Sequence, residues 1–63
     1  GFLFVTEAMK GADIEVLSVD GRRLLLEQNV TADKIDLSQL PTGTAIVRIV
    51  TKEKVVSQPI VIQ

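Results

Sequence analysis

Apolar and polar residues alternate along several short stretches of this chain, and a period of two is typical of β-strands. In residues 14–18, for example, Ile14 and Val16 alternate with Glu15, and residues 44–51 are rich in β-branched side chains. No turn-free window of about eleven residues repeats apolar side chains at the spacing of a helix. The pattern therefore predicts strands, without a regular helix longer than about one turn.

Turn residues divide the pattern into predicted strands at residues 2–6, 14–18, 23–27, 34–36, 44–51 and 55–62. Asp20-Gly21 predicts a hairpin turn in which Gly21 takes a positive φ angle. Residues 28–33 form a predicted polar loop, and Lys52-Glu53-Lys54 a charged turn that pairs the strands on either side as an antiparallel hairpin. Because Pro59 lacks a backbone N–H, we expect the last strand to lie at a sheet edge or to bulge there.

Short strands joined by close turn signals predict an all-β fold, specifically a small immunoglobulin-like antiparallel β-sandwich. Sixty-three residues make one domain, near the size at which a single core becomes marginal. Within residues 23–27, strict alternation places Leu24 and Leu26 on one face of the strand and Leu25 on the other.

The composition excludes several kinds of function. The chain has neither cysteine nor histidine, which excludes disulfides, thiolate metal sites and histidine-based catalysis. Its net charge is −1 with both signs interspersed, whereas a nucleic-acid-binding protein needs a basic face. No apolar run approaches the ~20 residues that span a bilayer.

The sequence contains no candidate catalytic site. Its acidic residues fall mostly in predicted turns or on solvent-facing positions, and they form no Asp-x-Asp ligand loop. Ser18, Ser38 and Ser57 have no histidine to act as their base. The Asp20-Gly21-Arg22 turn could be read as an adhesion-like loop, but turn chemistry favours a hairpin turn with a solvated arginine. We expect no enzyme activity, no cofactor and no metal.

Three segments are informative because of their order along the chain. The first is the turn Asp20-Gly21-Arg22 between two predicted strands. The second is the run Asp36-Leu37-Ser38-Gln39-Leu40-Pro41-Thr42-Gly43, which leads into the strand Thr44-Ala45-Ile46-Val47-Arg48-Ile49. The third is the apolar ending Ile60-Val61-Ile62. Each segment alone is a weak signal, whereas the ordered set is fairly specific.

In this order the segments resemble the C-terminal sorting domain, type A, of the type IX secretion system (Por secretion system) of Bacteroidetes. That family has a hairpin of the form strand, Asp-x-x-Gly-Arg or similar, strand. An Asp-Leu-Ser-x-Leu-Pro-x-Gly segment, a strand with Val-Arg-Ile and a β-branched last strand follow. The resemblance covers residues 14–63. It implies a recognition motif that consists of Gly21, Arg22, Asp36, Leu37, Ser38, Leu40, Pro41, Gly43, Val47, Arg48, Ile49, Ile60, Val61 and Ile62.

The chain departs from the family pattern at three places. Ala45 stands where the family usually has Tyr, and Pro59 stands where Lys is common. The family's opening segment, often an Asn-Pro turn followed by a strand, has no counterpart, so we expect the sandwich to lack its first strand. An unpaired edge would then favour a strand-paired or swapped homodimer at high concentration.

The resemblance implies a C-terminal secretion signal. Residues 1–63 would form a single sorting domain at the end of a larger secreted protein. The expected partners are the fused cargo, the outer-membrane translocon and a sortase-like peptidase. The expected route leads through the periplasm and outer membrane to the cell surface, often with later cleavage and lipopolysaccharide anchoring. The alternative is a structural or glycan-binding immunoglobulin-like module of an extracellular enzyme, although a glycan binder would display aromatic platforms and only Phe2 and Phe4 are aromatic.

Overall fold

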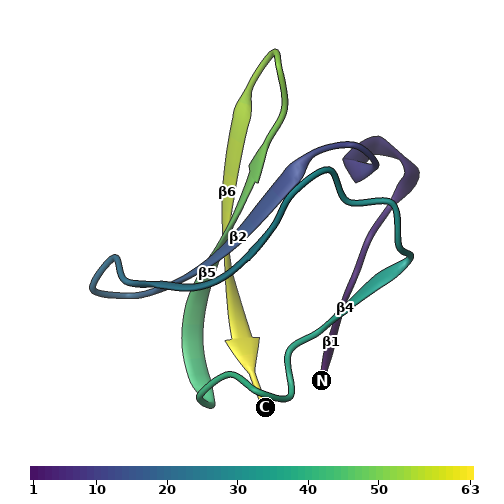
Figure 1. The fold of residues 1–63 in the computed structure, drawn as a ribbon. Coiled ribbons are helices and arrows are strands. Elements are labelled where there is room, and N and C mark those ends of the chain that lie inside the picture. The colour runs from purple at the N-terminus through teal and green to yellow at the C-terminus, as the bar shows by residue number, and fades with distance from the viewer.

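A computed structural model describes all 63 residues and contains six strands and one short 3-10 turn. In chain order the elements are β1 (Phe2–Phe4), η1 (Glu7–Met9), β2 (Asp13–Ser18), β3 (Arg23–Glu27), β4 (Lys34–Asp36), β5 (Gly43–Val50) and β6 (Val55–Ile62). Figure 1 shows the β5–β6 turn projecting at one end of the molecule and both chain termini at the other end. No helix is long and apolar enough to cross a membrane.

The strands form two antiparallel sheets of unequal width. The larger sheet has the order β3-β2-β5-β6, and the smaller one consists of β1 and β4. Strand β5 pairs with β2 from Ala45 to Val50 and with β6 along its whole length. The predicted hairpin of residues 46–50 with residues 55–62 is confirmed, and so is the small all-β sandwich.

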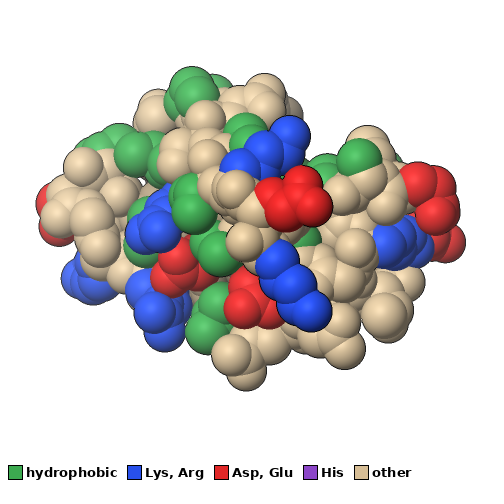
Figure 2. All heavy atoms as spheres, turned by 90° about the horizontal axis from the view of Figure 1, so that it is seen from above, with side chains coloured by type: hydrophobic (Ala, Val, Ile, Leu, Met, Phe, Trp, Pro, Cys, Tyr) green, Lys and Arg blue, Asp and Glu red, His purple; other side chains and the backbone are tan.

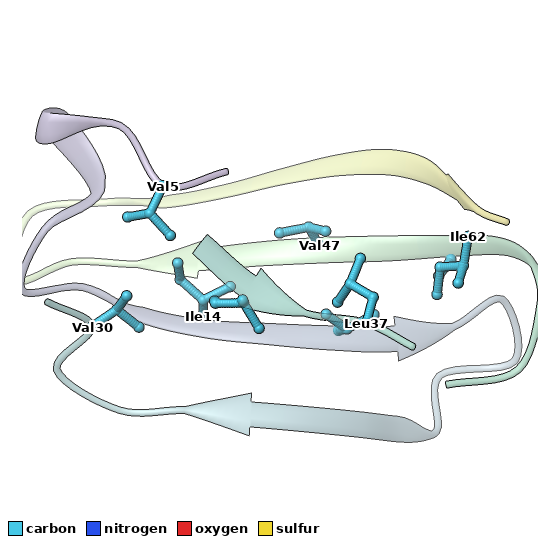
Figure 3. Packing of buried hydrophobic residues seen from close by; sticks show 9 residues of the cluster. Val5, Ile14, Val30, Leu37, Val47 and Ile62 are labelled. Atoms are coloured by element: carbon cyan, nitrogen blue, oxygen red, sulfur yellow. The ribbon is translucent and has the colours of Figure 1, made fainter. Parts of the chain in front are cut away.

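The core lies between the two sheets (Figure 3). Inward positions alternate along β2 and β5, and the two most deeply buried large side chains, Ile14 and Val16, are completely inaccessible. From the other side, Val5, Ile35 and Leu37 close the core. Only ten of the 63 residues are buried, and all ten are apolar, so the fold depends on few side chains.

Strand β1 is shorter than the sequence predicts. It ends at Phe4: Val5 still donates its backbone N–H to the carbonyl of Asp33, and Thr6 then begins the 3-10 turn. The backbone N–H of Lys10 donates to the carbonyl of Glu7 and closes that turn. The other predicted strands agree with the structure to within one residue at each end.

The prediction for strand β3 is wrong in its detail. A register shift lies between Val16 and Leu17 of β2, where Val16 faces Leu25 and Leu17 faces Arg23. The extra residue, Leu24, forms a β-bulge, which breaks strict alternation. As a result both Leu24 and Leu25 pack against the core, while Leu26 is exposed.

The predicted polar loop, residues 28–33, contributes a core residue. Val30 is buried, and its backbone bonds to the segment before β2: Gly11 N–H donates to the carbonyl of Val30, and Val30 N–H donates to that of Ala12. Lys10 ties down the same loop by donating to the carbonyl of Thr31 and to the carboxylate of Asp33. This ion pair holds the pKa of Asp33 below its usual value. The loop therefore closes the β3 side of the sandwich.

Strand β6 is an edge strand, as Pro59 predicts, and its pairing with β5 has no bulge. Thr51 N–H donates to the carbonyl of Lys54. Every second pair counted back from Thr51 therefore also exchanges hydrogen bonds, namely Ile49 with Val56, Val47 with Gln58, Ala45 with Ile60 and Gly43 with Ile62. Pro59 faces Ile46, which falls between these bonded pairs. The missing N–H of Pro59 therefore points to the free edge and leaves the ladder with β5 complete.

Replacing Ile14 with Ala should lower the free energy of unfolding by about 2–5 kcal/mol, because the site is fully buried between the sheets and cannot collapse easily. The matched change Val19→Ala, at an exposed turn residue, should stay within about 0.5 kcal/mol of the wild type. Urea unfolding followed by far-ultraviolet circular dichroism measures both. Equal losses for the two variants would contradict this location of the core.

Candidate functional site

The segment from Asp36 to Gly43 is a turn that connects the small sheet to the large one. The carboxylate of Asp36 accepts a hydrogen bond from the backbone N–H of Ser38 at 2.8 Å, which is an Asx turn. Leu40 N–H then donates to the carbonyl of Leu37, and Leu37 N–H donates to that of Gly1. The spacing of Asp and Ser in the motif therefore has a local structural cause.

The apolar and the glycine positions of this turn also serve the fold. Leu37 is 5% exposed and Leu40 is half-buried against the core, whereas Ser38 and Pro41 face solvent. Gly43 has a φ angle of +124°, a backbone conformation that residues other than glycine rarely adopt. An added Cβ at Gly43 would meet no atom within 4 Å, so the constraint is the backbone angle itself.

The pKa of the Asp36 carboxyl lies below its ordinary value. The main cause is the backbone hydrogen bond from Ser38, followed by the hydrogen bond from its hydroxyl, and the positive charges of the N-terminus and Lys34 add to it. These interactions favour the ionised form of Asp36.

The β2–β3 turn is held by Ser18. The backbone N–H of Gly21 donates to the carbonyl of Ser18, and Gly21 has φ +90°, as the sequence predicts. The hydroxyl of Ser18 donates to Asp20 and accepts from the backbone N–H of Arg22. The bond from Ser18 also lowers the pKa of Asp20. Arg22 itself is exposed at this end of the molecule.

The motif residues of β5 and β6 divide between the two faces of the large sheet. Val47, Ile49, Ile60 and Ile62 face inward and belong to the core or pack against it. Val61 lies on the outer face and is 67% exposed.

Arg48 also lies on the outer face, next to Glu15 of β2, with 3.6 Å between Arg48 Nη1 and Glu15 Oε1. Glu15 in turn accepts a hydrogen bond from Nε of Arg23 of β3 at 2.9 Å.

Apart from the inward-facing residues of β5 and β6, the motif lies in three separate places. One is the Asp36–Gly43 turn, which meets the C-terminal strand where Gly43 pairs with Ile62. The second is the outer face with Arg48, and the third is the β2–β3 turn with Gly21 and Arg22. Glu15 and Arg23 belong to the same outer face but were not among the predicted site residues. The register of three strands brings them together, and the only sequence signal was the alternation of Glu15 with Ile14 and Val16.

The surface offers little for a small ligand. One open hollow, about 340 Å³, is lined by residues 27–32 and 34–36, six of nine of them polar or charged. A second, of about 170 Å³, is mostly apolar and lies between β1 and the inner face of β5 and β6. No group of three or more acidic, histidine or cysteine side chains could hold a metal ion. Figure 2 shows acidic and basic side chains next to one another over the face in view, without a large patch of one sign.

The chain matches one protein family over nearly its whole length. The sequence profile of the family described as "Secretion system C-terminal sorting domain" matches residues 2–63. The chain belongs to this family, the C-terminal sorting domains of type IX secretion. Neither a curated protein nor a solved structure matches the chain.

Membership has direct consequences for this sorting domain. Such a domain is a C-terminal sorting signal, acts together with the type IX secretion machinery on a fused cargo, and is associated with export to the cell surface or secretion. The family is not an enzyme family.

Acidification should destabilise the sorting domain through Asp36. Because the folded pKa lies below the unfolded one, the carboxylate stabilises the fold above about pH 3.9, and this contribution is lost as the pH falls through the lowered value. Asp36→Asn keeps an acceptor for the Ser38 N–H but does not titrate. Its Tm should therefore fall less than that of the wild type between about pH 6 and about pH 3.

Asp36→Ala removes the acceptor, so its Tm should be lower than that of Asp36→Asn at both pH values. Asp20 and Asp33 still titrate in every variant, so the decrease is reduced and not abolished. Thermal unfolding at the two pH values measures the effect. An Asn variant as acid-sensitive as the wild type would contradict this role of Asp36.

Proposed function

We propose that residues 1–63 form the C-terminal end of a larger secreted protein and direct that protein through the type IX outer-membrane translocon. The family match over residues 2–63 carries this proposal. The motif residues support it in two ways. Several of them, such as Leu37, Val47 and Ile62, form the core of the domain, and others, such as Arg22 and Val61, are exposed, where a receptor could contact them.

The proposed route has three steps. The cargo crosses the inner membrane and folds in the periplasm, where the sorting domain folds with it. The translocon then recognises the folded domain. A sortase-like peptidase finally removes the domain and joins the cargo to lipopolysaccharide at the cell surface. Recognition in the second step needs an accessible surface, and the folded domain offers the open edge of strand β6. Strand β6 ends at the same end of the molecule as the N-terminus, which would connect to the cargo (Figure 1).

The alternative of a glycan-binding module gains no support from the surface. The hollow of about 340 Å³ has no aromatic residue in its lining, although stacking on an aromatic ring is what a sugar-binding platform offers. The ring of Phe2, which is 49% exposed, has the Lys34 ammonium over one face, 4.4 Å from the ring centre. Phe4, which is 72% exposed, is the only aromatic residue that lines a second, mostly apolar hollow of about 170 Å³.

An export assay tests the proposal. The domain is fused behind a periplasmic reporter in a Bacteroidetes host, and reporter is measured in the periplasm and at the surface or in the medium. The fusion should be exported, while the same reporter without the domain should stay in the periplasm. Equal export with and without residues 1–63 would contradict the proposal.

Point variants separate folding from recognition better than truncation does. Deleting residues 59–63 should trap the reporter, but it also removes Ile62, which is 3% exposed and part of the core. Gly43→Val should impair export indirectly through backbone strain. Pro59→Lys restores the usual family residue at a position outside the bonded pairs, so export should be unchanged or improved. A loss of export in the folded Pro59→Lys variant would contradict this assignment of the edge.

We also propose that the isolated domain self-associates through β1. Val5 and Leu37 N–H groups bond across the β1–β4 pair, so the backbone groups of Phe2 and Phe4 point to the other, unpaired side. The residues of β1 include neither a charged side chain nor a proline, whereas β6 contains Pro59. Strand addition, by pairing or by swapping, is therefore favoured here.

Light scattering from micromolar to millimolar protein should show a rising mean mass for the wild type. Phe4→Lys, which places a charge on the open strand, should lower the association, whereas the matched change Val19→Lys at an exposed turn should not. A strict monomer at all concentrations would contradict the dimer.

A further inference from the structure

The domain has a single readily oxidised side chain, that of Met9. The sequence contains one methionine and no cysteine, histidine, tryptophan or tyrosine. The thioether of methionine is converted to a sulfoxide by mild oxidants, whereas aliphatic, acidic and basic side chains are not. The place of Met9 in the fold therefore decides how the domain responds to an oxidant.

Met9 is the last residue of η1 and connects this turn to the core. Its sulfur, Sδ, accepts the backbone N–H of Thr6 at 3.5 Å, and its own N–H donates to the carbonyl of Thr6 at 3.0 Å. The side chain is half-buried and packs against the core cluster. Met9 thus holds the η1 turn both by hydrogen bonds and by apolar contact.

The hollow of about 170 Å³ gives solvent a route to this side chain. Met9 lines it together with Leu3 and Phe4 of β1 and with residues from the inner face of β5 and β6. Phe4 is mostly exposed, so this wall of the hollow borders solvent. A water molecule takes up about 30 Å³ in the liquid, so the hollow has room for hydrogen peroxide, which is hardly larger. An oxidant can therefore reach the sulfur while the domain is folded.

We propose that Met9 is a site of reversible oxidation and that its sulfoxide weakens the attachment of β1 and η1 to the core. A lone pair of Sδ attacks one oxygen of hydrogen peroxide, and the S–O bond forms as the O–O bond breaks. The leaving hydroxide takes up the proton of the transferred oxygen and departs as water. The sulfur loses two electrons and the peroxide gains them. This chemistry belongs to the domain itself and does not depend on the proposed function.

The sulfoxide oxygen has no good place where the thioether packs. Oxidation makes the flexible apolar side chain of Met9 polar. Gln58 of β6 is the only polar residue in the lining of the hollow, and the others offer no side-chain hydrogen bond. An oxygen left among them lacks a partner, and one that turns to solvent draws Met9 out of its packing. Strand β1, with three residues and only β4 as its partner, depends on packing of this kind.

Peroxide treatment of the purified domain tests the proposal. Mass spectrometry should show the gain of one oxygen atom at Met9, and thermal unfolding should give a Tm lower by at least about 5 °C. Reduction by the two epimer-specific methionine sulfoxide reductases should restore both the mass and the Tm. An unchanged or raised Tm of the oxidised form, as a hydrogen bond from Gln58 to the new oxygen would give, would contradict the weakening. A Tm that stays low after complete reduction would contradict reversibility.

Two variants show whether the effect belongs to position 9. Met9→Leu keeps a similar side-chain volume but has no thioether, so peroxide should change neither its mass nor its Tm. Val19→Met in the Met9→Leu background places the thioether at an exposed turn residue. This variant should gain one oxygen atom, but its Tm should change by less than about 3 °C. A loss of Tm equal to that of the oxidised wild type would overturn the proposal.

The urea dependence of the oxidation rate identifies the route to the sulfur. With access through the hollow of the folded domain, the rate should vary by less than about twofold from zero urea to the onset of the unfolding transition. With access only through global unfolding, the logarithm of the rate would rise over this range with the slope of the equilibrium unfolding curve. That result would contradict the route through the hollow. All these measurements use the purified domain, so their failure would leave the export proposal standing.

Discussion

Strand β5 is hydrogen-bonded along both of its edges, and the rest of the structure depends on this double pairing. Its bonds to β6 alternate with its bonds to β2, so each residue of β5 contributes to one ladder. Its inward residues, among them Ala45 and Val47, are almost fully buried. With so few buried residues in total, the two ladders and this single row of side chains determine whether the domain folds.

The family motif therefore combines two different physical roles. Asp36, Leu37 and Gly43 shape the turn that brings the chain into β5, and none of them needs to touch a partner to be essential. Arg48 and Val61 lie on the outer face and do little for the core. A substitution in the motif can thus abolish secretion either by unfolding the signal or by removing a contact, and only folded variants reveal which.

Much of the fold could be predicted from the sequence, because its signals are local. The turn at Gly21, the charged turn at residues 52–54 and the edge position of Pro59 follow from chemistry within a few residues. The sorting family was identified from motif order, and the match over residues 2–63 confirms it. These predictions needed no knowledge of which strands are neighbours.

The predictions that depended on neighbouring strands were less successful. The bulge at Leu24 arises from the register between β2 and β3, so alternation along β3 alone assigned the wrong faces to its leucines. Val30 is buried because the loop pairs with Gly11 and Ala12, far away in sequence. The cluster of Glu15 with Arg23 and Arg48 likewise requires the order β3-β2-β5, which no segment of the sequence shows by itself.

The central claim is that strand β5 is hydrogen-bonded on both sides and that its neighbour β6 has an open outer edge. Native-state hydrogen exchange of single backbone amides tests this claim most directly. The amides of Val47 and Arg48, which bond to different neighbours, should both exchange only on global unfolding. The amides of Ser57 and Val61, which point away from β5, should exchange far faster. Protection of Ser57 and Val61 equal to that of Val47, or rapid exchange throughout β5, would contradict this account.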